Sequence, residues 1–211
     1  MLSLYLVRHG QTDASLNNRF CGRIDPPLNA TGLAMAEALA ARYGREGFVE
    51  IVASPLVRAQ QTAAPTARAA GLPVTADEGL VEIAYGEWDG RLEADVERDD
   101  AARFAAWAAH PGRVAPPGGE SGADIAVRAL AAVERIRARH GDGNVMVVSH
   151  KATIRVLVCA LLGIDVDEFR RRIGQRVCAV NLIQLKSTGP LLQILGDVSH
   201  LPPALLEGDG T

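Results

Sequence analysis

The sequence predicts an α/β fold in three layers, with helices on both faces of a mostly parallel central sheet. Three apolar runs of strand length are each followed by a polar loop and then by a helical pattern. That order is typical of parallel strands joined by crossover helices, and the strands are almost continuously apolar, as a doubly covered sheet requires. With 211 residues, of which 48% are hydrophobic, the chain is long enough for one such domain.

Three strand–helix units carry this pattern. Their helices are identified by apolar or alanine residues that recur at helical spacing. Asn29 or Thr31 is available to cap the first helix, and Gly71 and Gly163 end the other two. The predicted strands are 4–7, 48–53 and 144–148, and the helices that follow them are 31–43, 58–70 and 152–162.

The segment 91–119 differs in composition from the rest of the chain. It is charged and rich in alanine up to His110, and then rich in proline and glycine. This composition predicts a cap-like helical excursion and a stiff return loop within a single domain of residues 1–201, rather than a domain boundary. The last residues, 202–211, predict a flexible tail.

A long helix and a hairpin complete the predicted domain. Residues 121–140 have helical periodicity, and Glu120 and Ser121 stand at their start. A carboxylate and a hydroxyl at that position can accept hydrogen bonds from the unpaired amides of a first helical turn. The apolar runs 180–185 and 191–195 flank a turn that contains glycine and proline, and they predict two antiparallel strands.

The composition argues against a nucleic-acid partner, a disulfide framework and a membrane segment. The formal net charge of −3 argues against a nucleic-acid partner, because binding to the phosphate backbone depends on positive charge. Three cysteines without a close pair argue against a disulfide framework. No basic leader precedes the first apolar run, and the longest apolar stretch, 156–162, is far shorter than the roughly 18 residues of a membrane helix. We therefore expect a cytoplasmic protein without a membrane partner.

Side chains that carry chemistry follow all three predicted parallel strands. Arg8 and His9 follow the first strand, Arg58 opens the helix after the second, and His150 and Lys151 follow the third. Ligands of open α/β sheets bind beyond the carboxyl ends of the strands, so we expect these side chains to converge at one edge. Two of the five histidines in the chain therefore meet two arginines at that edge.

This combination of residues favours an anion over a metal ion. Arginine grips the oxygens of a phosphate group, and histidine can act as a nucleophile, a base or a metal ligand. Two permanent cations would repel a divalent metal in a partly desolvated cleft. The residues therefore predict a phosphoryl group held by Arg8 and Arg58 and attacked by an imidazole, with no metal and no cofactor.

The flanking residues resemble the histidine phosphatase superfamily, which also contains the cofactor-dependent phosphoglycerate mutases. The resemblance extends from residue 4 to about 201 and lies in four ordered segments at or near the predicted strand ends. Two weaker matches are Gly118–Ser121 and Gly196–Leu201. The four segments are L-V-R-H-G-Q-T at 6–12, S-P-L-x-R-A-x-Q-T at 54–62, V-S-H at 148–150 and L-x-E-x-x-x-G-x-W-x-G at 80–90.

The resemblance implies a fold like that of the phosphoglycerate mutases and a role for each matched residue. His9 is then the nucleophile, which forms a phosphohistidine intermediate. Arg8, Arg58 and His150 bind the phosphoryl oxygens and stabilise the transition state. Glu82 is the proton donor to the leaving oxygen and then the base for the attacking water.

A further segment, Asn18–Gly22, resembles the substrate loop of the mutases. The chain departs from the mutase pattern at Ala14 and Ser15, where the mutases usually carry Trp-Asn. It also carries Lys151 where the family usually has glycine, so this lysine either adds a cation to the pocket or points to solvent at a helix start. The predicted substrate-binding residues are Gln11, Thr12, Ser15, Arg19, Cys21, Gly22 and Lys151.

The choice of reaction depends on the spacing after the segment 80–90, which carries Glu82. Glu82 and Glu120 are 38 positions apart, which is similar to the phosphatase branch, whereas the mutases carry a longer insertion. We therefore expect a phosphoric monoester hydrolase acting on a small phosphorylated substrate. The alternatives are a phosphoglycerate mutase, which returns the phosphoryl group to a second hydroxyl, and an inactive module that binds a phosphorylated ligand. The sequence leaves open both the substrate and the oligomeric state, for which a homodimer is supported by base rate alone.

Overall fold

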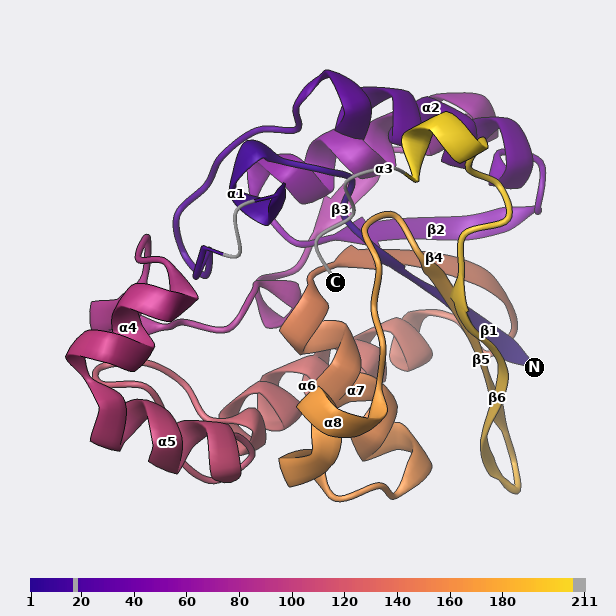
Figure 1. Cartoon of the computed structure of the whole chain (residues 1–211). Helices are drawn as coiled ribbons and strands as arrows, with labels where there is room; N and C mark the ends of the chain where they lie inside the picture. The colour runs from indigo at the N-terminus through magenta and orange to yellow at the C-terminus, as the bar shows by residue number, and fades with distance from the viewer. Residues whose placement is uncertain (17–18, 207–211) are drawn as a thin grey trace.

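The computed structural model describes residues 1–16 and 19–206 of the chain and has a six-stranded mixed sheet at its centre (Figure 1). The strands lie in the order β3-β2-β4-β1-β5-β6. The pairs among the first four are parallel, and the pairs β1–β5 and β5–β6 are antiparallel. The strand bounds are β1 Leu2–Arg8, β2 Phe48–Ala53, β3 Val74–Ala76, β4 Gly143–Ser149, β5 Val180–Lys186 and β6 Gly189–Asp197.

Helices cover both faces of this sheet, so the predicted α/β class with three layers is confirmed. Helices α2 and α3 pack on one face, and α6 and α7 pack on the other (Figure 1). The helix bounds are α1 Asp13–Leu16, α2 Ala30–Tyr43, α3 Val57–Ala70, α4 Glu93–Asp99, α5 Ala101–Ala109, α6 Gly122–Arg139, α7 Lys151–Leu162 and α8 Phe169–Arg172. Short 3-10 turns occupy Glu78–Leu80, Gly86–Trp88, Val166–Glu168 and Pro203–Leu205.

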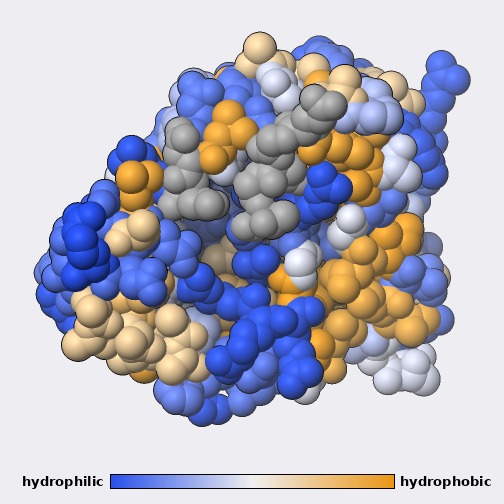
Figure 2. Space-filling view, viewed as in Figure 1, coloured by the Kyte–Doolittle hydropathy of each residue, from blue (hydrophilic) through white to orange (hydrophobic). Residues whose placement is uncertain are grey.

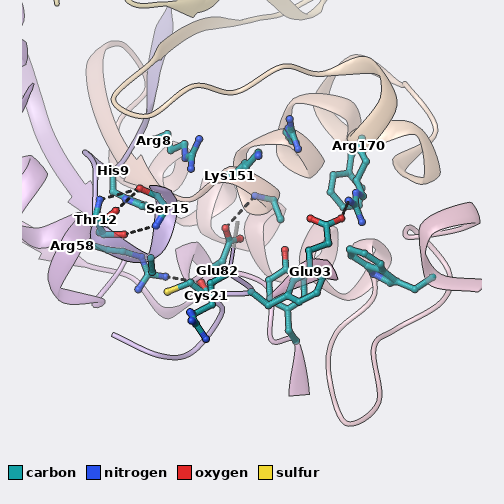
Figure 3. Close-up of a pocket in the computed structure, with 18 residues that line it drawn as sticks. Arg8, His9, Thr12, Ser15, Cys21, Arg58, Glu82, Glu93, Lys151 and Arg170 are labelled. Carbon is teal, nitrogen blue, oxygen red and sulfur yellow. Dashed lines mark hydrogen bonds and ion pairs between the residues drawn. The ribbon is translucent and has the colours of Figure 1, made fainter. Parts of the chain in front are cut away.

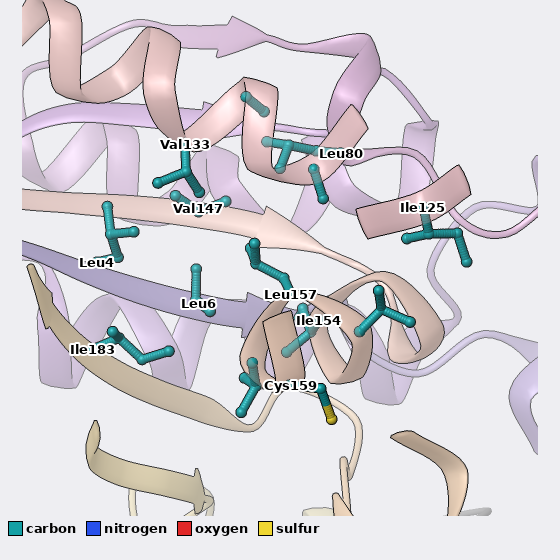
Figure 4. Close-up of a cluster of buried hydrophobic side chains, with 14 of the residues drawn as sticks. Leu4, Leu6, Leu80, Ile125, Val133, Val147, Ile154, Leu157, Cys159 and Ile183 are labelled. Atoms are coloured by element: carbon teal, nitrogen blue, oxygen red, sulfur yellow. The ribbon is translucent and has the colours of Figure 1, made fainter. Parts of the chain in front are cut away.

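Alternation of side chains along the central strands divides the core into two clusters. Leu4, Leu6 and Val147 point towards α6 and α7 (Figure 4), whereas Val7 and Val148 belong to the cluster under α2 and α3. All five side chains are fully buried. The two-residue period of a strand therefore supplies apolar contacts to both helical layers, which explains why these strands have no polar face.

The helix ends agree with most of the predicted signals. Asn29, one of the two candidate caps, accepts a hydrogen bond from the Gly32 amide at the start of α2. Ser121 caps α6 and forms a reciprocal capping box with Asp124. Glu120 does not cap the helix; its carboxylate instead accepts hydrogen bonds from the Ala84 amide and from an arginine of α6.

The excursion predicted over 91–119 contains α4 and α5, which project from the body of the molecule (Figure 1). Its apolar side chains form a third cluster together with Phe20 and Trp88, and Tyr85 packs against both this cluster and the core under α6 and α7. Trp107 of α5 is central to this cluster and packs against Phe20 and Trp88 with ring centroids 5.7 and 5.6 Å away. This segment therefore packs on an aromatic cluster beside the sheet.

Two short elements add to the sequence-based expectations. The predicted hairpin is confirmed as β5–β6, but the three-residue strand β3 was not predicted, because it is too short to show a period. Within the segment predicted as a tail, Pro203–Leu205 form a 3-10 turn, and Leu205 and Leu206 pack against the core. Residues 207–211 lie outside the described residues. Within the described residues, no helix has the length and apolar composition needed to cross a membrane.

Candidate active site

The register of the parallel strands brings the predicted catalytic residues together. Arg8 is paired with Ser149 at the carboxyl ends of β1 and β4, so the next residue on each strand is a histidine. The ring centroids of His9 and His150 lie 5.1 Å apart. The amide of Ser54, at the end of β2, donates to the Val148 carbonyl and completes this edge of the sheet.

A pocket of about 130 Å³ opens at this edge and receives side chains from segments far apart in the sequence (Figure 3). In the space-filling view the surface is hollowed between the α4–α5 segment and α8, with hydrophilic side chains along α8 at the rim (Figure 2). Nine of the twelve predicted site residues line the pocket, namely Arg8, His9, Thr12, Ser15, Arg19, Cys21, Arg58, Glu82 and Lys151. The other three, Gln11, Gly22 and His150, lie outside its lining.

The hydrogen bonding of His9 leaves one ring nitrogen available to a ligand. Nδ1 lies 2.7 Å from the carbonyl oxygen of Gly10, and because a carbonyl can only accept, Nδ1 carries the proton. Burial, followed by the charges of Arg58 and Arg8, lowers the pKa of His9 well below its ordinary value. The imidazole is therefore neutral at pH 7, and Nε2 keeps an unprotonated lone pair.

A close contact between two glycines holds the His9 loop against α2. A Cβ atom added to Gly10 would lie 2.7 Å from the Gly32 carbonyl oxygen, and one added to Gly32 would lie 2.1 Å from that of Gln11. The Gly10 amide also donates to the Thr62 hydroxyl at 2.9 Å. No larger residue fits at either glycine without moving backbone, so this contact sets the position of the nucleophile.

His150 is fully buried outside the pocket lining and contacts two lining residues, His9 and Arg58. Arg58 Nε donates to its Nδ1 at 3.2 Å, which places the imidazole proton on Nε2, and Nε2 donates to Ser54 Oγ at 2.8 Å. Burial, followed by the charges of Arg58 and His9, lowers the pKa of His150 well below its ordinary value. A neutral His150 therefore fixes the orientation of Arg58 and lies beside His9.

The two arginines of the site are held by main-chain carbonyls. Arg58 is 1% exposed, and its guanidinium donates to the carbonyls of Gly22 and Ile24 at 3.1 and 2.9 Å. Arg8 is also buried and donates to the Gln175 carbonyl at 2.7 Å. A carbonyl orients a guanidinium without cancelling its charge. Arg58 also forms an ion pair of 3.6 Å with Asp25, whose side chain is 41% exposed.

The carboxylate of Glu82 lies at the N-terminus of α7. Its oxygens accept hydrogen bonds from the amides of Ala152 and Thr153 at 3.2 and 3.3 Å, and from that of Ile83 at 2.8 Å. The first turn of a helix has unpaired amides, which hold the side chain of Glu82 in one position. Glu82 is thereby fixed in the pocket wall, across from His9 (Figure 3).

The predicted substrate-binding residues divide into two groups. Thr12 and Ser15 bond to each other through reciprocal amide–hydroxyl bonds of 3.0 and 3.1 Å, which form the start of α1 in the pocket wall. Arg19 donates to the Gly90 carbonyl, and the Cys21 carbonyl accepts from Arg58 at 3.3 Å. Both Arg19 and Cys21 line the pocket.

The second group supports the wall without lining it. The side chain of Gln11 accepts from Asn29, and the Gly22 amide donates to Asp89 at 2.8 Å. Both residues therefore order the loops that carry lining residues. Asn18, which the sequence places in the substrate loop, lies outside the described residues.

The charge of the lining selects for anions. Six cationic side chains and two carboxylates line the pocket, from Arg8, Arg19, Arg58, Lys151, Arg155 and Arg170 against Glu82 and Glu93. This imbalance in a partly desolvated cleft attracts a phosphate ester. Across the part of the chain that the structure describes, no three His, Cys, Asp or Glu side chains gather in the manner of a metal site.

Comparison with known families decides the classification. The sequence profile of the histidine phosphatase superfamily (branch 1) matches residues 4–198. The chain belongs to the histidine phosphatase superfamily. The family predicted from the four sequence segments is confirmed.

Some relatives of this histidine phosphatase are named as phosphatases, and others are named as phosphoglycerate mutases. It is 37% identical to "Phosphoserine phosphatase 1" of Hydrogenobacter thermophilus over 80% of each chain. It is 33% identical to "Probable phosphoglycerate mutase GpmB" of Enterobacter sp. over 98% of this chain and 99% of the other. A solved mycobacterial glucosyl-3-phosphoglycerate phosphatase in complex with VO3 is 31% identical, with a TM-score of 0.85 over 92% of this chain and 98% of that one. The expected class, a phosphoric monoester hydrolase, agrees with these named phosphatases.

Sequence reasoning missed one side of the pocket of this histidine phosphatase. Glu93 of α4, Arg155 of α7 and Arg170 of α8 all line it, and Arg170 pairs with Glu93 at 3.0 Å. The guanidinium of Arg170 also lies 4.1 Å from the ring centre of Trp107. Of these three residues, only Arg155 could have been predicted from the sequence, because it lies one helical turn after Lys151 on the same face of the helix. We call Lys151, Arg155 and Arg170 the outer wall, and Arg8, His9, Arg58 and Glu82 the catalytic floor.

Proposed function

We propose that this histidine phosphatase hydrolyses a small phosphate monoester through a phosphohistidine on His9, with Glu82 as the proton donor. The observation that carries the proposal is the hydrogen bond from His9 Nδ1 to the Gly10 carbonyl. It leaves the lone pair of Nε2 free in a pocket that Arg8 and Arg58 also line. A neutral imidazole beside two fixed cations combines a nucleophile with a site for the group that it attacks.

In the first step, His9 Nε2 attacks the phosphorus atom. The Nε2–P bond forms while the ester P–O bond breaks, and the leaving oxygen takes a proton from the Glu82 carboxyl group. Arg8 and Arg58 bind the phosphoryl oxygens and stabilise their charge in the transition state. The bond from Nδ1 to Gly10 keeps the phosphorylated imidazole in place.

In the second step, a water molecule attacks the phosphohistidine. Glu82, now a carboxylate, takes a proton from the water as the O–P bond forms and the P–Nε2 bond breaks. Inorganic phosphate leaves, and His9 and Glu82 return to their starting protonation states. The sum of the two steps is an ester plus water giving an alcohol plus phosphate, so no further reactant is needed.

The proposed reaction is independent of metal ions. Arg8, Arg58 and the α7 N-terminus supply positive potential at the phosphoryl site, which is the role a divalent metal has in other phosphatases. The six cations of the lining would also oppose the binding of a divalent ion.

Phosphoglycerate mutase activity is the second candidate, because one relative that matches almost the whole chain carries that name. A mutase would pass the phosphoryl group from His9 to a second hydroxyl of the substrate instead of to water. The two reactions separate on one substrate, 3-phosphoglycerate, which yields free phosphate in one case and an isomer in the other.

The test is phosphate release from a panel of small phosphate monoesters in excess chelator. We expect release by the wild type and a loss of at least about ten-thousandfold in His9→Ala, because the nucleophile cannot be replaced by a neighbour. His140→Ala is the matched control, since this histidine lies at the opposite end of β4. Release that requires added metal, or that persists in His9→Ala, would overturn the mechanism. Binding without release from any ester, and without isomer formation, would favour an inactive binding module.

A further inference from the structure

The pocket continues beyond the catalytic floor along one face of α7. Lys151 is the first residue of this helix, and Arg155 follows one turn later, about 6 Å further along the helix axis. Arg170 of α8 lines the same side, and Lys151 lies between the His9 side of the pocket and Arg170 (Figure 3). The outer wall therefore extends away from the position where the phosphoryl group would be attacked.

The cations of the outer wall have donors without acceptors. Among the described residues, neither Lys151 nor Arg155 has a hydrogen-bond or ion-pair partner for its side chain. Arg155 Nε and Arg170 Nη1 are buried from solvent and unpaired, and so is Trp107 Nε1 in the same lining. Buried donors of folded proteins are nearly always satisfied, so three unsatisfied donors around one pocket indicate a missing acceptor.

The positive charges of the outer wall also outnumber the carboxylates beside them. Glu93 pairs with Arg170 at 3.0 Å, and Glu82 is held by the amides at the start of α7. Burial, followed by the charges of Arg8 and Arg155, lowers the pKa of Lys151 to about 8. Like charges in a partly buried wall destabilise one another, and a bound anion would relieve this repulsion.

Aromatic side chains also line the pocket. Phe20, Tyr85, Trp107 and Phe169 line it together with the cations. They provide apolar contacts for a short carbon skeleton, whereas a large hydrophilic sugar would leave its hydroxyls without partners against these rings.

We propose that Lys151, Arg155 and Arg170 form a second anion subsite, and that the substrate is a phosphate monoester with a second anionic group on a short carbon skeleton. The phosphoryl group occupies the catalytic floor, and a carboxylate or a second phosphate accepts hydrogen bonds from the outer wall. This inference rests on the proposed phosphatase function and adds the class of substrate to it.

The test compares substrates that differ only in the second anionic group. Phosphoserine and phosphoethanolamine differ by a carboxylate, and 1,3-propanediol bisphosphate and 3-hydroxypropyl phosphate differ by a phosphate. We expect the wild type to prefer the more anionic member of at least one pair by about tenfold or more in kcat/KM, from hydrogen bonds to a charged group. The pair with the larger ratio identifies the anion.

Arg155→Gln should reduce that ratio by about tenfold, mainly through KM, because it replaces the charged guanidinium with a shorter neutral amide. The matched control is Arg137→Gln, an exposed arginine of α6, which should leave the ratio unchanged. A wild-type ratio of kcat/KM near one in both pairs would overturn the subsite. So would an Arg155→Gln variant that loses kcat/KM equally for both members of a pair.

Failure of the subsite and failure of the phosphatase function give different results. If p-nitrophenyl phosphate is hydrolysed in a His9-dependent manner without any preference within the pairs, only the subsite is wrong. If no ester is hydrolysed, the phosphatase function is wrong. In that case the dissociation constants of the same pairs, measured by calorimetry, still decide whether the outer wall binds a second anion.

Discussion

In the catalytic floor, Arg8 and Arg58 donate to main-chain carbonyls and Glu82 accepts from main-chain amides. In the outer wall, Arg170 contacts the side chains of Glu93 and Trp107 instead. The carbonyls that hold Arg8 and Arg58 belong to the loop residues Gln175 and Gly22, and the amides that hold Glu82 belong to α7. A main-chain partner remains when its residue is substituted, whereas a side-chain partner is lost. The comparison suggests that this fold keeps the phosphoryl chemistry constant and leaves the choice of substrate to the outer wall.

The two regions also differ in how they are assembled. The catalytic floor comes from residues at the end of β1, at the start of α3 and just after the 3-10 turn Glu78–Leu80. The outer wall needs α7, α8 and the α4–α5 excursion to pack against one another. Substitutions in the floor should therefore change kcat strongly, and those in the outer wall should act mainly on KM.

After His9→Ala, the substitution Glu82→Gln is expected to lower kcat most. An amide cannot donate or accept the proton in the proposed steps, so kcat for an alkyl phosphate should fall by about a hundredfold or more. The loss should be smaller for p-nitrophenyl phosphate, whose leaving group departs without a proton. Steady-state kinetics on both esters measure the difference. Equal losses on both esters would show that Glu82 is a positioning group and not the proton donor.

A smaller effect is expected from pH at the outer wall. The pKa of Lys151 is lowered to about 8, so its ammonium group is charged below this pH and neutral above it. The preference for 3-phosphoglycerate over glycerol 3-phosphate, neither of which titrates near this pH, should fall up to about tenfold as the pH rises through about 8. Profiles of kcat/KM for both esters test this.

Lys151→Met provides the control for that pH dependence. It removes the titrating group, so the preference should be low and independent of pH. A preference that still falls near the same pH in this variant would assign the titration to another group.

The smallest effect is expected for Glu93→Gln. It removes the carboxylate that pairs with Arg170 at the pocket edge, where the exposed fractions of the two side chains are 40% and 29%. A partly exposed pair contributes at most about 1 kcal/mol, so KM for an anionic ester should fall only about two- to fivefold. Initial-rate kinetics should show an unchanged kcat. A large fall in kcat would place Glu93 in the chemical steps. It would contradict the expectation that this side of the pocket acts mainly on KM.

The same division explains what could be predicted from the sequence. Arg8, His9 and His150 were identifiable because each adjoins an apolar strand, and the edge of a parallel sheet brings such residues together. The hydrogen bonds that set the His9 and His150 tautomers were not readable, since they depend on Gly10, Arg58 and Ser54 in three dimensions.

Arg170 and Glu93 were missed for a different reason. They are 77 positions apart and meet only because α8 and α4 border the same pocket. No periodicity or spacing within either segment encodes that contact. A helix of four residues, such as α8, is also too short to give a pattern.

The most direct test of the account is to identify the phosphorylated residue. Glu82→Gln should slow the attack of water and let the intermediate accumulate, so a rapid quench of this variant in alkali with p-nitrophenyl phosphate should trap it. We predict an acid-labile, alkali-stable phosphoryl group on the peptide that carries His9, seen by mass spectrometry and absent from a Glu82→Gln variant that also carries His9→Ala. A phosphoryl group on His150 or on any other residue, or turnover with no phosphorylated enzyme in the quench, would contradict it.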